Sequence, residues 1–367
     1  MNGGIAEFGR LRGSIPSWLF PVLEDELGEL DGKHKEFVAA CEACRPQVYM
    51  ATYRWGGIGC PTKGRLALCK AFIAKAVWDF QTTRALIEAM RCRPLLRRLC
   101  GWETLGAVPS EATFSRAFAA FAGDGLPQRI HEATVTTRYA GKIAGHVRRD
   151  ATAVRAREKG VGRTAQPAPP PKKRGRPCKG EVRPPPEPTR LQRQLGSTPE
   201  ANLADLPTAC DWGCKKNSQG KAERWRGYKL HLDTIDGDIP VSAILTSASL
   251  HDSQAAIPLA QMTAARVCSL YDLADAAYDA KEIRTMSARL GHVAIIDPNP
   301  HRGEKLELSP AKSVRSRERS AAERANSHLH DEHGGRHVRV RGAAKVAAHL
   351  AFGLLVISVE QLLKLLG

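Results

Sequence analysis

Apolar positions along the chain change their spacing, and the change predicts a boundary in the fold. From residue 1 to about 140 the apolar side chains recur at helical spacing, as in residues 66–80, which contain neither Pro nor Gly. Further on, Tyr228, Leu230 and Leu232 alternate with polar residues, as strands do. The spacing predicts a helical part over 1–140 and an α/β part over 141–367.

The second part is expected to contain a mixed sheet. Asp236-Gly237 supplies a hairpin turn between the strand at Tyr228–Leu232 and a second strand at Ile239–Leu245, so these two should pair antiparallel. A strand, a helix and another strand then follow in the order that predicts a parallel crossover. The further expected elements are a strand over 145–154, a strand over 267–273, a helix capped by Asp279 and ending near Leu290, a strand over 293–296, and helices over 313–330 and 343–366.

One helix of the first part has a possible role in binding. Ser110 is placed to cap it, and an apolar stripe that includes Phe114, Phe118 and Phe121 leaves Arg116 outside. With the segment Leu95–Leu99 upstream, the pair fits a helix-turn-helix that places one helix in a DNA groove, with Arg116 as a candidate contact. Ordinary helix packing explains the same pattern equally well.

Residues 160–195 interrupt the second part. They contain nine Pro and nine Lys or Arg against two acids, and few large apolar side chains, which predicts a disordered insertion without a core. Within it, Lys172, Lys173, Arg174 and Arg176 surround an Arg-Gly-Arg-Pro centre that resembles an AT-hook, a minor-groove binder. A solvated basic linker is the alternative, and the two carry similar weight.

The overall charge favours an anionic partner. Lys and Arg number 55 against 38 Asp and Glu, which gives a formal charge of +17. Nucleic acid is the polyanion that such a surplus most readily explains, because each neutralised phosphate releases counterions. A cationic protein that is merely soluble is the alternative.

The ends of the chain predict a cytoplasmic protein without a membrane anchor. The first twenty residues include Glu7, Arg10 and Arg12 and contain no apolar run long enough for a signal peptide. The apolar run over 350–359 is too short to span a membrane and predicts a buried C-terminal helix.

The ten cysteines are therefore expected to be reduced thiols. Cys41 and Cys44 form a C-x-x-C, and Cys210 with Cys214 a looser pair. A zinc site is conceivable there, but buried free thiols are the preferred interpretation because the spacing matches no compact zinc module.

Three acids occupy positions where an α/β fold forms sites. Asp150 lies in the strand over 145–154, Asp275 comes just after a strand, and Glu323 lies in the helix after the sheet. That helix has an apolar stripe, which includes Val314 and Leu329, and a second, polar face. The polar face comprises Ser316, Arg319, Glu323, Asn326 and His330. On its own, a solvated face with an i,i+4 ion pair explains this pattern best.

A family resemblance changes that interpretation. The motifs occur in family order and cover most of residues 145–360, although no single one suffices. Together they make the chain resemble a DDE transposase of bacterial insertion sequences. The motifs are Asp150-Ala151-Thr152, Cys210-Asp211-Trp212-Gly213, Gly227-Tyr228-Lys229-Leu230-His231, Ile239-Pro240-Val241 with Thr246-Ser247-Ala248, His251-Asp252, Asp275-Ala276-Ala277-Tyr278 and Glu323-Arg324-Ala325-Asn326.

The resemblance implies a ribonuclease-H-like catalytic domain behind a helical DNA-binding or dimerisation domain. Asp150, Asp275 and Glu323 would hold two Mg²⁺ or Mn²⁺ ions, which activate water or a 3′-hydroxyl and stabilise the leaving oxygen. The partners implied are double-stranded DNA at the terminal inverted repeats and at the target, and a homodimer or higher oligomer that pairs two ends near the bacterial nucleoid. Rival acids are Asp211, Asp233, Asp252, Asp272 and Asp297, of which Asp252 is the strongest and is taken as supporting or structural.

The chain departs from the family signature Tyr-x2-Arg-x3-Glu-x6-Lys on the Glu helix. These positions are Ser316, Arg319, Glu323 and His330, so the aromatic and the lysine are missing. Arg319 can still clamp a phosphate, and His330 can do so when charged. The expected function is strand cleavage and transfer. The alternatives are a transposon-derived DNA-binding protein without turnover, and a nuclease that cuts without joining.

Overall fold

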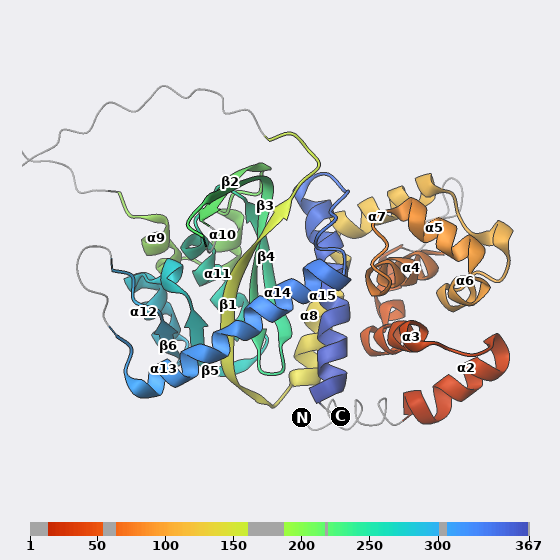
Figure 1. Ribbon diagram of the computed structural model, residues 1–367, viewed down its shortest axis with the longest axis horizontal. Coiled ribbons are helices and arrows are strands. Elements are labelled where there is room, and N and C mark those ends of the chain that lie inside the picture. Colours follow the sequence, from red (N-terminus) through yellow and green to blue (C-terminus); the bar gives the residue numbers. More distant parts are fainter. Residues whose placement is uncertain (1–13, 54–63, 161–186, 217–218, 301–306, 366–367) are drawn as a thin grey trace, which may run out of the picture.

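The computed structural model describes residues 14–53, 64–160, 187–216, 219–300 and 307–365. Figure 1 shows a sheet with its helices on the left, a bundle of N-terminal helices on the right, and the long helix α15 (Ala343–Leu365) between them. A mixed α/β sheet preceded by a helical region is the predicted fold class, and it is confirmed.

The N-terminal helices pack around a core of aromatic and small apolar side chains. Phe72, Phe114 and Phe121 are almost fully buried in it. The helices are α2 (Phe20–Leu27), α3 (Gly32–Cys44), α4 (Arg65–Val77), α5 (Thr83–Cys92), α6 (Pro94–Cys100), α7 (Glu111–Gly123) and α8 (Leu126–Tyr139), with short turns η1 (Ile15–Leu19), η2 (Pro46–Tyr53) and η3 (Leu105–Ala107).

The predicted stripe on α7 is confirmed, with its Phe residues buried and Arg116 exposed. Ser110 occupies the N-cap position, but its hydroxyl is paired with the Thr113 hydroxyl and makes no hydrogen bond to the backbone. The helix therefore begins at the predicted N-cap residue, but without a side-chain capping hydrogen bond.

The sheet has six strands with both parallel and antiparallel neighbours. β1 pairs antiparallel with β3 on one edge and parallel with β5 on the other, and β5 pairs parallel with β6. The long β3 pairs antiparallel with β2 along its first half and with β4 along its second, so the predicted hairpin and the parallel pair are confirmed. The strands are β1 (Ile143–Arg155), β2 (Asp211–Lys216), β3 (Ala222–Ile235), β4 (Ile239–Ser247), β5 (Cys268–Ala274) and β6 (Val293–Ile296).

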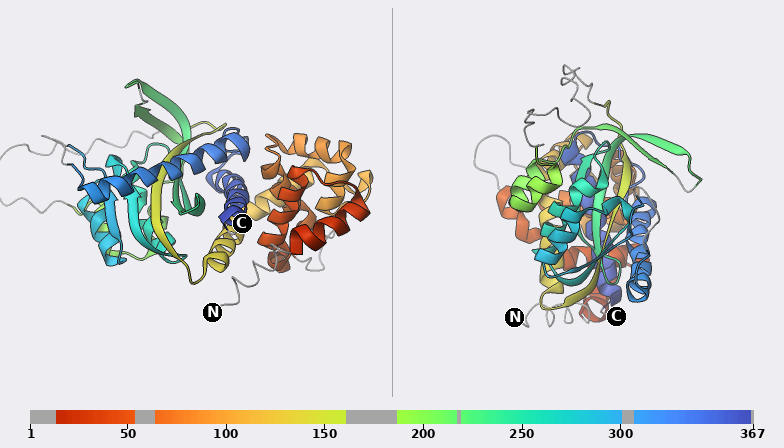
Figure 2. Two further views of the ribbon diagram at one scale, coloured as in Figure 1. Left: turned by 60° about the horizontal axis from the view of Figure 1, so that its bottom comes forward. Right: turned by 90° about the vertical axis from the view of Figure 1, so that its left-hand side faces the viewer.

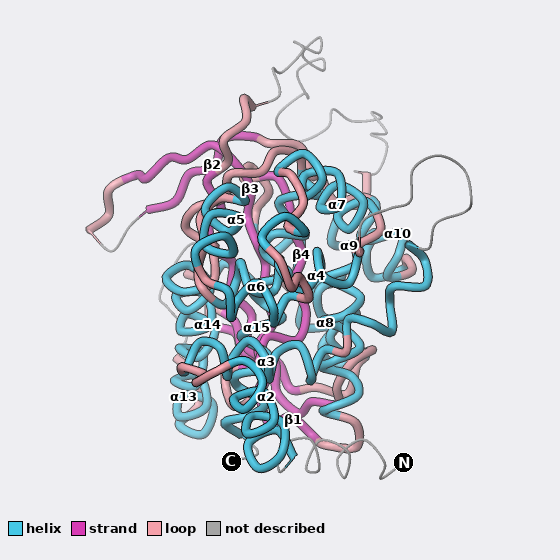
Figure 3. Tube along the Cα trace, turned by 90° about the vertical axis from the view of Figure 1, so that its right-hand side faces the viewer, coloured by secondary structure: helices cyan, strands magenta, loops and turns pink. Residues whose placement is uncertain are grey.

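Helices cover both faces of this sheet. The helix α14 (Ser320–Glu332) crosses β1 and β3 on one face (Figure 2), and the core beneath it includes Leu230, Ala325 and Leu329. A separate core joins α11 (Ala256–Ala264) and α12 (Lys281–Arg289) to β5 and β6. In Figure 3, β2 and the first half of β3 project beyond the body of the protein. The remaining elements are α9 (Arg190–Gly196), α10 (Pro199–Ala204), η4 (Asp252–Ala255), η5 (Ala276–Tyr278), α13 (Pro310–Ser316) and η6 (Arg317–Arg319).

The C-terminal helix α15 belongs to two cores at once. Phe352 and Leu355 pack among the N-terminal helices, whereas Leu350 and Leu354 pack in the core shared with α14. By length and composition α15 could cross a membrane, yet 78% of its most apolar window is buried inside the protein. It is thus the predicted buried helix, and it ties the helical part to the sheet.

Three sequence predictions are wrong in detail. The predicted insertion was drawn too long, because α9 begins at Arg190 with a capping box from Thr189, and Leu191 and Leu195 pack against the α11–α12 core. Asp279 accepts hydrogen bonds from Arg284 and from the Asn299 backbone instead of capping α12. Val314 is 63% exposed, because the predicted single helix breaks into α13, η6 and α14 and the apolar stripe does not continue through the break.

Candidate active site

Strand pairing brings two of the three predicted acids together. The parallel register of β1 and β5 matches Val147 with Asp272 and Arg148 with Leu273. Two residues further along, the same register sets Asp150 beside Asp275, where β5 has just ended. Residues beyond the carboxyl ends of parallel strands meet at one edge of the sheet, which is where α/β folds form their sites.

The third acid is carried by α14, which Asn326 fastens to β1. The Asn326 side-chain amide donates a hydrogen bond to Asp150 Oδ2 at 2.9 Å. Glu323 lies one helical turn before Asn326, on the face directed toward the two aspartates. Its side chain is 60% exposed and accepts a hydrogen bond from Arg319 at 3.4 Å, which is the expected i,i+4 pair.

The electrostatics of Asp150 reflect the charges of the two other acids. Burial is the main cause that raises the pKa of Asp150 to about 6, and the charges of Asp275 and Glu323 raise it further. Hydrogen bonds from the Ala151 backbone and from Asn326 lower this pKa but do not compensate. Neighbouring negative charges disfavour the ionised form of a buried carboxylate. Such a carboxylate is a typical ligand for a divalent cation, which stabilises the ionised form.

Asp275 is held at the start of a short turn. Its side chain accepts a hydrogen bond from the Ala277 backbone N–H at 2.9 Å and caps η5. Burial raises its pKa, the Asp252 and Asp297 carboxylates raise it further, and the nearby Arg319 guanidinium lowers it. Arg319 therefore supplies positive charge next to both Asp275 and Glu323.

The two residues that depart from the family signature, Ser316 and His330, both form hydrogen bonds within the protein. Ser316 donates a hydrogen bond to the Ser313 carbonyl at 2.8 Å. His330 lies 3.0 Å from the Thr152 hydroxyl on β1, and burial, assisted by the charge of Arg336, lowers its pKa. His330 is consequently neutral at pH 7 and braces α14 against the sheet.

Two of the rival acids belong to a buried polar network on the opposite face of the sheet. Asp233 accepts two hydrogen bonds from Arg149, at 2.9 and 2.7 Å, and one from Thr263. Asp272 accepts one from Ser287 and contacts His292 at 3.2 Å. Their hydrogen-bonding capacity is used inside the protein, so both are structural.

The strongest rival, Asp252, stands beside the candidate site. It forms an ion pair with Lys229 at 2.8 Å, and its charge raises the pKa of Asp275. Asp297 follows β6, also acts on Asp275, and donates its backbone N–H to the Ala274 carbonyl. Asp211 is farther along the sheet, in β2, where its carboxylate accepts from the Trp212 backbone. Asp252 and Asp297 therefore supply additional negative charge around Asp275.

The carboxylates at the site fit hard divalent cations, because Mg²⁺ and Mn²⁺ prefer oxygen ligands. Among the described residues, the oxygens of Asp150, Asp275 and Glu323 do not form a cluster within 4.8 Å. Glu323 is the exposed member with room to change rotamer, so metal binding would be expected to draw its side chain inward.

Two protein-family models match parts of this chain. A family model described as "Transposase DDE domain" matches residues 150–359, which is more than half of the chain. The chain belongs to the DDE transposase family. A second model, "Transposase domain (DUF772)", matches residues 35–120 within the helical part. Neither the curated proteins nor the solved structures gave a match.

Membership of this family confirms the resemblance, and the mixed sheet is consistent with a ribonuclease-H-like catalytic fold. Transposases of this family act on DNA and in general depend on a divalent metal. The first matched residue of the DDE model is Asp150 itself, and the match extends through Asp275 and Glu323 into α15.

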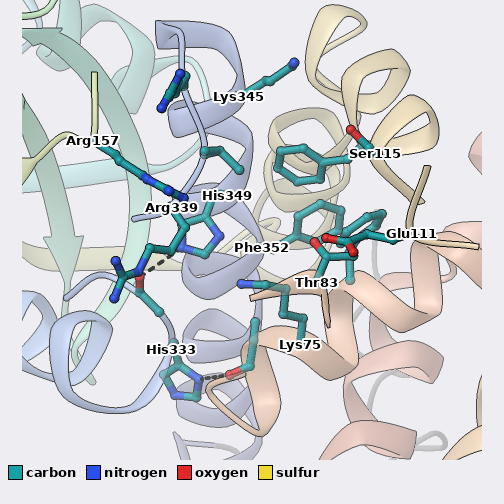
Figure 4. Close-up of a pocket in the computed structure, with 16 residues that line it drawn as sticks. Lys75, Thr83, Glu111, Ser115, Arg157, His333, Arg339, Lys345, His349 and Phe352 are labelled. Carbon is teal, nitrogen blue, oxygen red and sulfur yellow. Dashed lines mark hydrogen bonds between the residues drawn. The ribbon is translucent and has the colours of Figure 1, made fainter. Parts of the chain in front are cut away.

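A cationic cavity of about 370 Å³ lies away from these acids, where the helical part meets the end of β1. Figure 4 shows Arg157 and Arg339 on one side of it, Lys345 and Phe352 on α15, and Lys75 on the N-terminal helices. Burial lowers the pKa of Lys75 to about 8. Among the described residues, Arg157, Arg339, Arg341 and Lys345 have no ion-pair partner. The acid in the lining, Glu111, pairs with Arg84, so the cavity has an excess of positive charge.

Sequence reasoning did not find all of this site. Asn326 was recognised on the polar face, three residues after Glu323, but its contact with Asp150 was not predicted. Nothing in the sequence indicated the cationic cavity, because its arginines come from segments about 180 residues apart in the sequence.

The predicted DNA contacts Lys172, Lys173, Arg174 and Arg176 lie outside the described residues. Cys41 and Cys44 are buried thiols whose pKa burial raises, and neither belongs to a metal-ligand cluster among the described residues.

The raised pKa of Asp150 predicts a pH dependence of metal binding. Below about pH 6 a proton competes with the metal for this carboxylate, so the Mn²⁺ or Mg²⁺ concentration at half-saturation should rise roughly tenfold per pH unit. Above pH 6 it should be nearly constant. Titration of Mn²⁺ binding between pH 5 and 8 measures this, and a flat profile down to pH 5 would contradict the environment described for Asp150.

Proposed function

We propose that this transposase cleaves DNA strands at the ends of its element and joins the freed 3′-ends to target DNA. Asp150, Asp275 and Glu323 would hold two Mg²⁺ ions. The observation that carries the proposal is the convergence of a strand, a strand end and a helix on one set of carboxylates, with Asp150 fastened by Asn326. Such a set is what in-line phosphoryl transfer with two metals requires.

Each of the chain's own groups has a definite task in this reaction. Bound Mg²⁺ would supply the acidity that activates water or a 3′-hydroxyl and the charge that stabilises the leaving oxygen. Arg319, next to Asp275 and Glu323, is placed to bind a phosphate oxygen of the cut strand. Lys229 forms an ion pair with Asp252. Asn326 and His330 contact β1 and so fix the position of α14, which carries Glu323.

DNA binding would extend from the acids along β1 to the cationic cavity. The residues Arg157, Arg339, Arg341 and Lys345 offer unpaired positive charge near the end of this strand. Arg116 is exposed on α7, next to Ser115 of the cavity lining. The basic motif at Lys172, Lys173, Arg174 and Arg176 follows Arg157 by only some fifteen residues, so it can reach the same duplex. We assign the helical part over 1–140 to binding of the element ends, and a homodimer or higher oligomer to pairing of two ends.

The salt dependence of DNA binding tests this path. Replacing both Arg339 and Arg341 with Ala should weaken binding of any duplex and lower the slope of log K against log salt by about 2, because each lost phosphate contact removes about 0.9. Arg193→Ala is the matched control, since this exposed arginine lies on α9 and pairs with Asp205. Equal slopes for the double variant and the wild type would exclude the cavity from the path.

The decisive experiment combines the purified protein, Mg²⁺ and DNA that carries both ends flanking its own gene. Cleavage at the element ends followed by joining to a second DNA is the expected result. Cleavage without joining would indicate a nuclease of the same fold. Specific binding without cleavage would indicate a transposon-derived DNA-binding protein. That second candidate is favoured by one observation, namely that Ser316 and neutral His330 replace the aromatic and the lysine of the family signature.

A further inference from the structure

A cluster of histidine and glutamate side chains lies at the junction of the helical part and the sheet, apart from the DDE acids. His328 and Glu332 come from the end of α14, His333 follows that helix, Glu360 comes from α15, and Glu36 from α3. The ligand atoms of His328, Glu332 and His333 all lie within 4.8 Å of one another, and so do those of Glu36, His333 and Glu360. Three helices distant in sequence thus present metal-binding groups to one point.

The spacing of these atoms matches the coordination shell of a small transition metal. The two imidazole Nε2 atoms are 3.2 Å apart, and Glu360 oxygens lie 3.4 Å from His328 Nε2 and 3.5 Å from His333 Nε2. Glu332 lies 3.6 Å from His328 Nε2. Ligands at about 2.0–2.1 Å from a tetrahedral ion are separated by roughly 3.3–3.4 Å, so these distances are the edges of such a shell.

The tautomer of His333 directs its lone pair into the cluster. His333 is fully buried, and its Nδ1 lies 3.1 Å from the Ala76 carbonyl in α4 (Figure 4). A carbonyl only accepts hydrogen bonds, so Nδ1 carries a proton, and Nε2 faces the ligand atoms of His328 and Glu360. Histidines that bind metals are oriented in this way by a hydrogen bond from their other nitrogen.

Two carboxylates of the cluster adjoin each other, and one of their oxygens is buried without a hydrogen-bond partner. The Glu36 and Glu360 carboxylates lie side by side, with ligand oxygens within 4.8 Å of each other. One Glu36 oxygen binds Lys33 at 2.8 Å, but the other is buried without a hydrogen-bond partner. A cation at the centre would satisfy this oxygen and relieve the repulsion between the two carboxylates.

From these observations we infer that His328, His333 and Glu360, completed by Glu36 or Glu332, form a binding site for a divalent transition metal, with Zn²⁺ as the best match. Two imidazoles select Zn²⁺ and its neighbours over Mg²⁺, which prefers oxygen ligands alone. A site filled by four protein groups is structural, because no position is left for a substrate. The ion would link α3 and α15 to the helix that carries Glu323.

Metal binding to the tag-free full chain tests this site without any DNA. The chelator-treated wild type is expected to bind one equivalent of Zn²⁺ in the absence of Mg²⁺ and to melt at a higher temperature with it. With Co²⁺ as the probe, the intense visible absorption of a tetrahedral complex should appear. His328→Gln with His333→Gln should lower Zn²⁺ affinity at least tenfold and abolish the absorption.

His337→Gln, a nearby histidine outside the cluster, is the control and should leave both readouts unchanged. Weak octahedral Co²⁺ bands in the wild type, or equal Zn²⁺ affinity in the wild type and the double variant, would overturn the inference. The wild-type Co²⁺ spectrum decides the question even if the double variant does not fold. Because no DNA or cleavage is measured, failure of the proposed strand cleavage would not affect this result.

Discussion

Replacing Asp150 with Asn is expected to abolish Mg²⁺-dependent strand cleavage and, in the same molecule, to raise the stability of the metal-free protein. The substitution is isosteric, and the Asn oxygen can still accept the hydrogen bond from Asn326. Only the charge is lost. The two effects have opposite signs because the negative charge of Asp150 is needed to bind the metal but destabilises the metal-free folded protein.

The loss of cleavage follows from the central place of Asp150 between Asp275 and Glu323. A ligand that holds the catalytic metals supplies several kcal/mol of transition-state stabilisation, so the rate should fall by roughly a thousandfold or more. Glu323→Ala is expected to abolish cleavage in the same way. Binding of the element ends should remain largely intact in both variants, because it rests on the cationic surfaces.

The gain in stability follows from the pKa of Asp150, which is about 6 in the folded chain against 3.8 for an unperturbed Asp. The unfolded chain therefore loses this proton first as the pH rises. The penalty is absent below about pH 4, grows between pH 4 and 6, and is complete at pH 7, where it is on the order of 2–3 kcal/mol. The Asn variant avoids it and should melt a few degrees higher at pH 7 and at the wild-type temperature near pH 4.

Cleavage assays and thermal unfolding at pH 4 and pH 7, with and without Mg²⁺, measure both effects. Asp205→Asn is the matched control, since this exposed acid pairs with Arg190 on the surface and should leave cleavage and melting unchanged. Mg²⁺ should stabilise the wild type and not the Asp150 variant. Residual cleavage at a tenth of the wild-type rate would remove Asp150 from the metal site.

Local patterns in the sequence were enough to predict the strands and their neighbours. Alternation at Tyr228, Leu230 and Leu232 and the Asp236-Gly237 turn depend only on residues close together in the chain, and β3 and β4 pair as expected. The placement of Asp275 at a strand end was equally local. What these patterns could not supply was the register of β1 against β5, which sets Asp150 beside Asp275.

The errors occurred where contacts between distant segments decide the structure. The helical spacing of apolar residues continues through Val314, but the helix is interrupted at η6. There Arg148 from β1 donates hydrogen bonds to the Glu318 carbonyl and carboxylate. Leu191 and Leu195 lie in a Pro-rich, basic stretch, yet the α11–α12 core offers them an apolar surface. Composition alone could not show that surface. The metal-ligand cluster was missed for the same reason, since Glu36 and Glu360 are at opposite ends of the sequence.

Breaking the buried ion pair of Arg149 and Asp233 is expected to be the most destabilising single change in the sheet. Arg149 precedes Asp150 on β1 and points to the opposite face, where it is 3% exposed and its partner is fully buried. Burial alone would lower the pKa of Arg149, but the Asp233 carboxylate outweighs this and raises it, so the guanidinium stays charged. Arg149→Met leaves Asp233 buried without its counter-charge, which should cost about 3–5 kcal/mol.

Urea unfolding of Arg149→Met, Asp233→Leu and the double variant separates the interaction from the loss of volume. The double variant should recover most of the stability, because two apolar side chains replace a buried ion pair whose desolvation costs much free energy. Arg155→Met is the control on the same strand; its pair with Glu223 is exposed, so its loss should cost at most about 1 kcal/mol. A double variant no more stable than Arg149→Met would show that the network through Thr263, and not the ion pair, fixes β1. If the pair acts only as a brace, the double variant should also cleave DNA at close to the wild-type rate well below its melting temperature, because Asp150 and its contact with Asn326 lie on the untouched face.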